Sequence, residues 1–339
     1  MLGVLFFLIY INDLPNSTLL HSSMYADDST FLNSSNSVSV LESSTVNEMK
    51  KVIEWFHTNK MAVNIDKSNV MVFSPCLQPS PRVSITIENS NGIPVQISQI
   101  PNTDENSFKL LGFHIDERLT LKKQVDNICS KVNKSLFFLS RVKRTLPLYC
   151  RKQLYFSHVH SHFVYCLSLL SIANKTDIIK LERIQRKALR IVYNASFRAD
   201  TIPFFHDLCT LPISDLIERE VLKTMHNVYS YNHPKEFAEY WSTNAFLHEY
   251  SLRYSIRFDL PLVKSIRLSQ LPLFKFAQIY NNFPEDFKTI MERKEFVSKL
   301  EDFYGKQFKN ESCNNLFCRM CSYESWLNHR NNLSSSRKL

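Results

Sequence analysis

The stretch Met24-Tyr25-Ala26-Asp27-Asp28-Ser29-Thr30-Phe31 places two adjacent acids between short apolar segments. Carboxylates are costly inside a strand core, so this pair predicts a tight turn that exposes both acids at one edge of a sheet. Adjacent carboxylates repel each other, and a divalent cation relieves the repulsion; Mg²⁺ is usually held by one or two carboxylates together with substrate phosphates. Taken alone, an Asp-Asp pair is more often a helix cap or a solvated turn.

Glycine is scarce, which excludes several other chemistries. The 339 residues contain four glycines, whereas average usage would give roughly 24. The chain therefore has no G-x-G-x-x-G dinucleotide loop, no Walker loop and no G-x-S-x-G nucleophile elbow. A shortage of glycine turns also favours helices joined by Pro, Asn and Ser turns over a many-stranded barrel.

Positive charge is concentrated in the middle of the chain. The formal net charge is +9, but residues 118–198 contain 17 Lys and Arg against three acids, a net +14. Such an excess suits nucleic acid or an anionic membrane face. Within it, residues 177–193 predict a helix with two faces. Its basic face carries Lys180, Arg183, Lys187 and Arg190, and its apolar face carries Leu181, Ile184, Ala188 and Ile191. An ordinary solvated surface is the alternative interpretation of this basic face.

Hydrophobic periodicity predicts the main secondary-structure elements. Apolar residues at the i, i+3, i+4, i+7 spacing predict a helix that includes residues 49–56 and a long helix that ends near Arg144. The second helix has its apolar stripe at Val125, Ile128, Val132, Leu136 and Leu139. Short β-prone runs predict strands at 69–73, 83–87, 94–97 and 108–115.

The first eleven residues, MLGVLFFLIYI, are entirely uncharged. They lack the basic n-region of a signal peptide, and they are too short to span a bilayer, which takes about 20 residues. We expect this segment to be a buried internal element. A secreted protein with this segment as its leader is a less favoured interpretation of the chain. Five of the eight cysteines are scattered along the chain, which is typical of reduced thiols. These thiols indicate an intracellular protein that is not secreted.

Four segments in a fixed order carry a family resemblance. They are Leu5 to Pro15 (LFFLIYINDLP), Tyr25 to Asp28 (YADD), Trp55 to Ser68 with Asn59-Lys60-Met61 and Asn64-x-x-Lys67-Ser68, and Leu110 to Asp116 (LLGFHID). In this order they resemble the reverse transcriptases of non-LTR (LINE-type) retrotransposons. Later segments resemble the helical region that follows the polymerase in such elements, namely Leu119-Thr120, Leu146-Pro147, Gln185 to Arg190 and Asn281 to Glu285.

This resemblance implies an α+β fold and an RNA-directed DNA polymerase. The fold would be a truncated right-hand polymerase palm over residues 1–116, a basic helical thumb and connection over 117–200, and a mainly helical C-terminal region over 201–339. The implied partners are an RNA template and a DNA primer, with a deoxynucleoside triphosphate in the intact parent enzyme. No membrane partner is implied, and the way in which such elements insert implies a nuclear or cytoplasmic location.

The resemblance also assigns roles to individual residues. Asp27 and Asp28 would hold two Mg²⁺ ions that activate the primer 3′-hydroxyl and stabilise the leaving pyrophosphate. Tyr25 would lie beside them near the primer end, and Leu111-Gly112 resembles the primer-grip hairpin. The basic residues that would hold template and primer through phosphates, without reading sequence, are Lys122, Lys123, Lys131, Lys134, Arg141, Lys143, Arg144, Lys180, Arg183, Lys187 and Arg190.

The chain departs from the family pattern at its start. In the family, the third metal-binding aspartate and the nucleotide-binding fingers lie upstream of the segment that contains Gly3. We therefore predict that this chain alone does not synthesise DNA. The alternative function is a non-catalytic, transposon-derived nucleic-acid-binding protein in which the basic 118–198 region acts and Asp27 and Asp28 are relics.

Three weaker patterns remain. Cys313, Cys318, Cys321 and His329 include a C-x-x-C half-site, so structural Zn²⁺ is one interpretation and reduced thiols are the other. His158 and His162 are spaced as in zincins, but the H-E-x-x-H glutamate is absent, which favours surface or packing histidines. The Phe and Tyr residues are spread along the chain and are expected in the core rather than in a base-stacking platform.

Overall fold

The computed structural model describes residues 2–74, 81–88, 94–99, 107–242, 257–260, 262–263 and 266–307. These residues form two compact units. Unit 1 contains the described residues of 1–110 and 115–118, and unit 2 contains those of 111–114 and 119–339. The predicted boundary at 116/117 lies within the 115–118 segment of unit 1, and the one at 200/201 lies inside unit 2.

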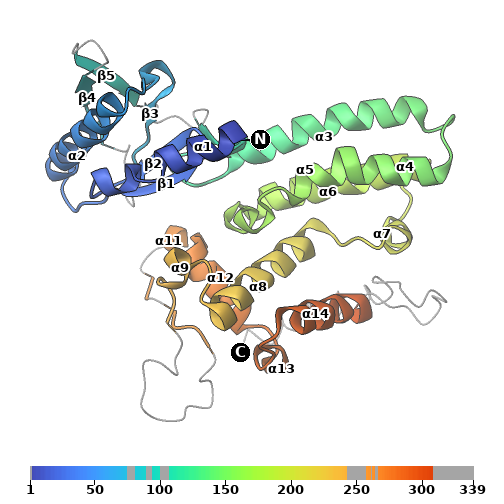
Figure 1. Cartoon of the computed structure of the whole chain (residues 1–339). Helices are drawn as coiled ribbons and strands as arrows, with labels where there is room; N and C mark the ends of the chain where they lie inside the picture. Colours follow the sequence, from blue (N-terminus) through green and yellow to red (C-terminus); the bar gives the residue numbers. More distant parts are fainter. Residues whose placement is uncertain are drawn as a thin grey trace, which may run out of the picture. The chain divides into compact units, whose positions relative to one another are not determined.

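Unit 1 combines two helices with short strands (Figure 1). Its elements in chain order are α1 (Leu2–Ile11), η1 (Leu14–Ser17), β1 (His21–Tyr25), β2 (Asp28–Leu32), α2 (Val38–Thr58), η2 (Ile65–Lys67), β3 (Asn69–Val70), β4 (Ile85–Glu88), β5 (Pro94–Gln99) and β6 (Phe108–Leu110). β1 and β2 form an antiparallel hairpin. β4 and β5 form a second antiparallel pair, and β3 runs parallel to β5 on its other side.

Helix α2 is central to the packing of unit 1. The periodicity of residues 49–56 predicted a helix at this place. One side of α2 packs through Ile53 against a cluster from β4 and β5 that contains Ile85, Ile87 and Ile97. Another side packs through Val52 against Ile11, Leu14 and partly buried side chains of the β1–β2 hairpin, including Met24 and Phe31. Because successive helix positions point about 100° apart, the neighbours Val52 and Ile53 serve two different clusters.

Glu48 of α2 fixes the chain where it enters β1. Its carboxylate accepts a hydrogen bond from the backbone N–H of Leu19 (2.7 Å) and another from the Thr18 hydroxyl (3.0 Å). The Leu19 hydrogen bond and the nearby Lys51 ammonium lower the pKa of Glu48 to about 2. The pKa is depressed in the folded state, so this stabilisation is present above the ordinary pKa of 4.5 and is lost as the pH falls towards 2.

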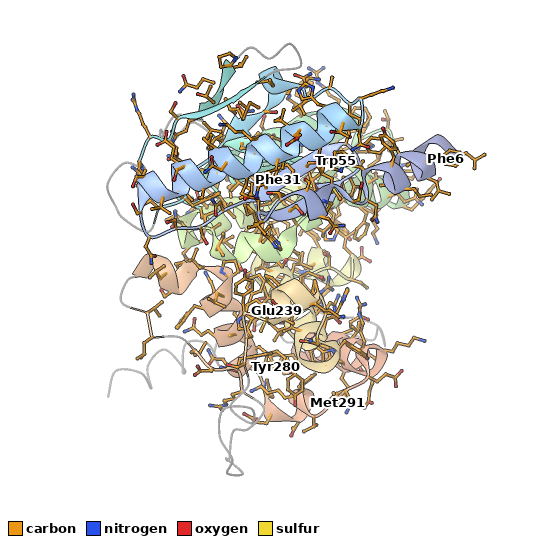
Figure 2. All side chains as sticks on the ribbon, turned by 60° about the vertical axis from the view of Figure 1, so that its left-hand side comes forward. Phe6, Phe31, Trp55, Glu239, Tyr280 and Met291 are labelled. Atoms are coloured by element: carbon orange, nitrogen blue, oxygen red, sulfur yellow. The ribbon has the colours of Figure 1, made fainter. Side chains whose placement is uncertain are left out.

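Helix α1 differs from the expectation of a buried element. It is apolar on every side, yet of its ten residues only Ile11 is buried. Phe6 is 63% exposed and Ile9 is 64% exposed, and Figure 2 shows Phe6 pointing away from the rest of unit 1. The prediction of a buried segment is wrong for the described structure, because the core of unit 1 accepts only one side of a helix that is apolar all round.

Unit 2 is helical apart from Phe113 and His114 of β7 (Phe113–Ile115), the second strand of the β6–β7 hairpin. Its other elements are α3 (Lys122–Val142), α4 (Leu148–Tyr155), the π-helix η3 (Phe156–His160), α5 (Ser161–Val164), η4 (Leu167–Ile172), α6 (Lys175–Val192), α7 (Ile202–Asp207), α8 (Ile213–Tyr231), α9 (Lys235–Ala238), α11 (Ile266–Gln270), α12 (Pro272–Asn281), α13 (Glu285–Lys288) and α14 (Arg293–Gln307). The small sheets and separate helices are compatible with an α+β fold.

The helices of unit 2 pack in two layers, one that contains α3 and α6 and one that contains α8. Helix α3 lies alongside α6 (Figure 1), and the five apolar residues that predicted α3 are all buried. Helix α8 contacts α6, η4, α12 and α14 and carries nine buried residues. A side-chain amide joins the two layers: buried Gln185 of α6 donates to the Leu211 carbonyl (3.0 Å) and accepts from the Ile213 N–H (3.1 Å). Gln185 thereby fixes the start of α8.

In the part of the chain that the structure describes, each helix is too short or too polar to cross a bilayer.

Candidate functional site

The two adjacent aspartates lie at the tip of the β1–β2 hairpin. Tyr25 is paired with Asp28, so Ala26 and Asp27 alone form the turn between the strands. Ala26 has a left-handed backbone conformation (φ 53°), which a two-residue hairpin turn requires and which glycine usually supplies. The tight turn that the sequence predicted at this place is therefore present.

Both carboxylates are accessible to solvent. Asp27 and Asp28 are exposed, and Tyr25 is 67% exposed. Side chains directly opposite each other in an antiparallel pair lie on the same face, which places Tyr25 beside Asp28. Two exposed, adjacent carboxylates are a donor set that a hard divalent cation accepts, with its remaining positions filled by water or phosphate. Within the described ranges, no group of three or more His, Cys, Asp or Glu side chains is placed to hold a metal ion.

The left-handed residue in this turn gives a stability prediction. Ala26→Gly is expected to raise the free energy of unfolding of unit 1 by about 1 kcal/mol, because an L-residue pays a steric penalty in this conformation that glycine avoids. Hydrogen exchange of the β1–β2 amides at increasing urea concentration measures this change in the free energy of unfolding.

Ala62→Gly is the matched control. Ala62 is exposed and is not among the residues with positive φ, so the same substitution there is expected to destabilise unit 1 by about 0.5 kcal/mol through the greater freedom of the unfolded chain. A loss of stability in both variants would show that the Ala26 conformation is not strained.

A second hairpin lies where β6 meets β7. The segment 108–115 was predicted as one strand, and this is wrong: Leu111 (φ 46°) and Gly112 (φ 87°) form a two-residue turn with positive φ at both positions. The Leu111 carbonyl accepts a hydrogen bond from the Tyr165 hydroxyl. A Cβ at Gly112 would lie 3.8 Å from that hydroxyl, an ordinary contact, so the backbone conformation and not crowding favours glycine here.

The basic residues of α3 lie on its solvent side. Of the predicted phosphate-binding residues in and just after this helix, those fully exposed are Lys122, Lys123, Lys131, Lys134, Arg141 and Arg144, and Lys143 is half-buried. The only acid of α3 is Asp126, which forms an ion pair with Lys180 of α6. The outer side of α3 therefore carries cations that no acid of the same helix balances.

The basic face of α6 is less available than its sequence indicated. Lys180 is paired with Asp126, and Arg190 donates through Nε to the Ala199 carbonyl (2.9 Å). Arg183 and Lys187 are exposed. Of the four residues that the helical spacing placed on one face, two already bind groups within unit 2.

Exposed aromatic side chains are features that the sequence interpretation missed. Phe197 is 85% exposed, Phe137 63% and Phe138 51%, so the expectation that aromatic residues lie in the core is wrong for these three. A usable signal was present for two of them, because Leu136 and Leu139 belong to the buried stripe of α3 and the helical period turns Phe137 and Phe138 away from it.

The remaining candidates have different outcomes. Cys313, Cys318, Cys321 and His329 lie outside the described residues. His158 is exposed, whereas His160 packs against the rings of Tyr155 and Phe156. Burial, together with the charge of Arg219, lowers the pKa of His160 to about 4. His160 is thus a half-buried packing residue, and His162 is half-buried as well; exposed His158 and half-buried His162 fit the prediction of surface or packing histidines.

Comparison with known proteins gives relatives of one kind. The chain is 23% identical over 255 residues to the RNA-directed DNA polymerase from mobile element jockey of Drosophila melanogaster, an alignment that covers 72% of this chain and 26% of that protein. It is also 23% identical over 226 residues to the probable RNA-directed DNA polymerase from transposon X-element of the same species, covering 64% and 24%. These matches, at low identity, confirm the predicted resemblance to RNA-directed DNA polymerases of non-LTR mobile elements.

The chain spans about a quarter of the length of the curated relatives it matches. No family model matches the chain. No solved structure matches it either.

Proposed function

We propose that the chain is part of an RNA-directed DNA polymerase of a non-LTR retrotransposon, in which unit 1 supplies metal-binding carboxylates and unit 2 binds the template and primer. One observation carries the proposal: the hairpin turn exposes Asp27 and Asp28 side by side, in a chain similar to polymerases of mobile elements. Under this proposal, unit 1 belongs to the palm and the basic helices α3 and α6 belong to the thumb.

The chemistry follows from what the exposed carboxylates can do. Divalent cations bound there would lower the barrier to nucleotidyl transfer by stabilising the attacking and leaving oxygens. Asp27 and Asp28 supply negative charge at a turn whose backbone is fixed by strand pairing, so both residues are held at the hairpin tip before a cation arrives. Tyr25 lies on the same face as Asp28 and offers a flat surface next to the reacting end of a primer.

A non-catalytic nucleic-acid-binding protein is the second candidate. It is favoured by the exposed cations of α3, which can bind phosphates whether or not the hairpin binds metal. The two candidates differ at Asp27 and Asp28, whose carboxylates matter only in the first.

Metal binding at the hairpin tests the difference. The purified chain is expected to bind Mn²⁺, a substitute for Mg²⁺, with a dissociation constant on the order of 1 mM, because two carboxylates form a weak site. Asp27→Asn combined with Asp28→Asn is expected to abolish this binding, as measured by the electron paramagnetic resonance signal of free Mn²⁺. Asp13→Asn, which removes one exposed carboxylate elsewhere in unit 1, is expected to leave it unchanged.

An unchanged Mn²⁺ titration in the double variant would favour the non-catalytic candidate. In the same preparations, the chain is expected to bind an RNA template annealed to a DNA primer without extending the primer. Mg²⁺-dependent extension that is lost in the double variant would show that our prediction of an inactive chain is wrong and that the hairpin is catalytic as it stands.

A further inference from the structure

The solvent side of α3 combines cations with two adjacent exposed aromatic rings. We define its outer stripe as Lys123, Lys131, Lys134, Phe137, Phe138 and Arg141, all of which are exposed. At 100° per residue these positions fall within about 60° of Lys134, on the side opposite the buried residues. The stripe is about 27 Å long, from the 1.5 Å rise per residue.

The charge of the outer stripe is complementary to a phosphate chain. Its four cations have no acid among them, and Asp126, the one acid of α3, points its carboxylate to Lys180. His162, whose pKa is lowered by burial and then by the charge of Lys131, lies close enough to that lysine to add positive rather than negative charge when it is protonated. A polyanion therefore meets no unpaired acid of α3 along the stripe.

Phe137 and Phe138 do not serve the fold. Both rings are more than half exposed, although each would gain roughly 1.5–3 kcal/mol from burial in a core. The Arg141 guanidinium lies over the Phe137 ring, with 4.9 Å between its central carbon and the ring centroid. The guanidinium adds positive charge beside the exposed Phe137 ring, and Phe138 is a second exposed ring next to it in the sequence; we call these three side chains the platform.

Such a platform matches the chemistry of unpaired nucleobases. Nucleobases stack on aromatic and guanidinium planes, and each stacked base contributes about 1–3 kcal/mol, largely independent of its identity. A continuous duplex keeps its bases stacked inside and offers mainly phosphates to such a surface. Cations followed by a stacking platform on the same helix face therefore favour a strand that has free bases at one point along its length.

We propose that Phe137, Phe138 and Arg141 form a stacking site for unpaired bases at the C-terminal end of the outer stripe, so that the chain binds single-stranded nucleic acid more tightly than its phosphates alone explain. The proposal rests on the proposed function, since both require the stripe to bind nucleic acid. It adds a base-dependent component to a surface that was expected to contact phosphates only.

The test compares two ligands that differ only in their bases. The full chain is titrated with a fluorescent oligothymidylate of about 12 nucleotides, within the usual site sizes for single strands, and with an abasic oligomer of the same number of phosphates. The chain is expected to bind the oligothymidylate about 10-fold more tightly, which corresponds to about 1.4 kcal/mol of stacking. The Phe137→Leu, Phe138→Leu double variant is expected to lose this preference and to keep its affinity for the abasic oligomer.

Matched variants separate stacking from other effects. Phe197→Leu makes the same substitution at an exposed ring off α3 that also has an arginine, Arg190, 6.0 Å from its centroid; it is expected to change neither affinity. Lys134→Gln is expected to weaken both ligands equally. Phe138→Trp is expected to preserve the preference, and its indole fluorescence should be quenched by the oligothymidylate more than by the abasic oligomer.

Three outcomes would overturn the inference: an unchanged preference in the leucine double variant, an equal loss for both ligands in that variant, or no preference in the unaltered chain. If the chain binds neither ligand at low salt, the failure lies with nucleic-acid binding itself and the proposed function falls as well. If both ligands bind equally and Lys134→Gln weakens both, the stripe binds phosphates and only the stacking site is wrong.

Discussion

The affinity of the chain for an RNA–DNA duplex is expected to fall about 150-fold when the salt concentration rises from about 50 to about 200 mM. The estimate counts four phosphate contacts, made by Lys123, Lys131, Lys134 and Arg141 on the outer stripe of α3. Each neutralised phosphate releases condensed counterions, and four of them give a slope of about −3.6 in a plot of log affinity against log salt. Fluorescence anisotropy titrations at several salt concentrations measure this slope.

Removing two of these charges should reduce the slope by half. Lys131→Gln combined with Lys134→Gln is expected to give a slope of about −1.8, so that the same rise in salt weakens binding only about 12-fold. Lys50→Gln, which removes an exposed charge from α2 in unit 1, is the control and is expected to keep the original slope. A slope that responds to Lys50 and not to the α3 lysines would place the phosphate contacts elsewhere.

Gln185→Leu is expected to lower the free energy of unfolding of unit 2 by about 3 kcal/mol, since it leaves two buried backbone groups without partners. These groups are the Leu211 carbonyl and the Ile213 N–H, both of which the Gln185 amide satisfies in the folded chain. Leucine fills a similar volume, so the expected loss comes from unmade hydrogen bonds rather than from a cavity. Hydrogen exchange of the α6 and α8 amides under increasing urea measures it.

Gln153→Leu provides the control for this variant. Gln153 is an exposed residue of α4, and the substitution there is expected to change stability by less than about 0.5 kcal/mol. Equal protection of α8 in the two variants would contradict the role assigned to the Gln185 amide.

Amphipathic helices were the part of the fold that could be predicted from sequence. α2, α3 and α6 were found because each combines a core-facing apolar stripe with a polar remainder, and Val125 to Leu139 kept their predicted side. Periodicity missed the β6–β7 turn, because Leu111 and Gly112 continue an apolar run and only their positive φ values break it into two strands; the family resemblance had placed a hairpin at these two residues. Periodicity describes which side a residue faces, and it carries little information on backbone dihedrals.

The candidate site divides in the same way. Local sequence predicted the turn at Asp27 and Asp28, because two acids between apolar strands have few other places to lie. The pairing of Lys180 with Asp126 and the bond from Arg190 to the Ala199 carbonyl depend on how distant residues meet, so the sequence overstated the free charge of α6. The helical period of α3 predicts that Phe137 and Phe138 are exposed. The sequence interpretation placed them in the core because it assigned aromatic residues to the core as a class.

The exposed apolar side chains of α1 affect how long the chain persists in a cell. Seven of its apolar side chains are each about half exposed or more: Leu2, Val4, Leu5, Phe6, Leu8, Ile9 and Tyr10. Chaperones and proteases survey newly made proteins for unfolded or partly folded chains, which expose apolar surface of this kind. A chain in which no other segment or partner covers α1 would be open to removal by this machinery, so its amount in a cell would depend on the rate of removal as well as on the rate of synthesis.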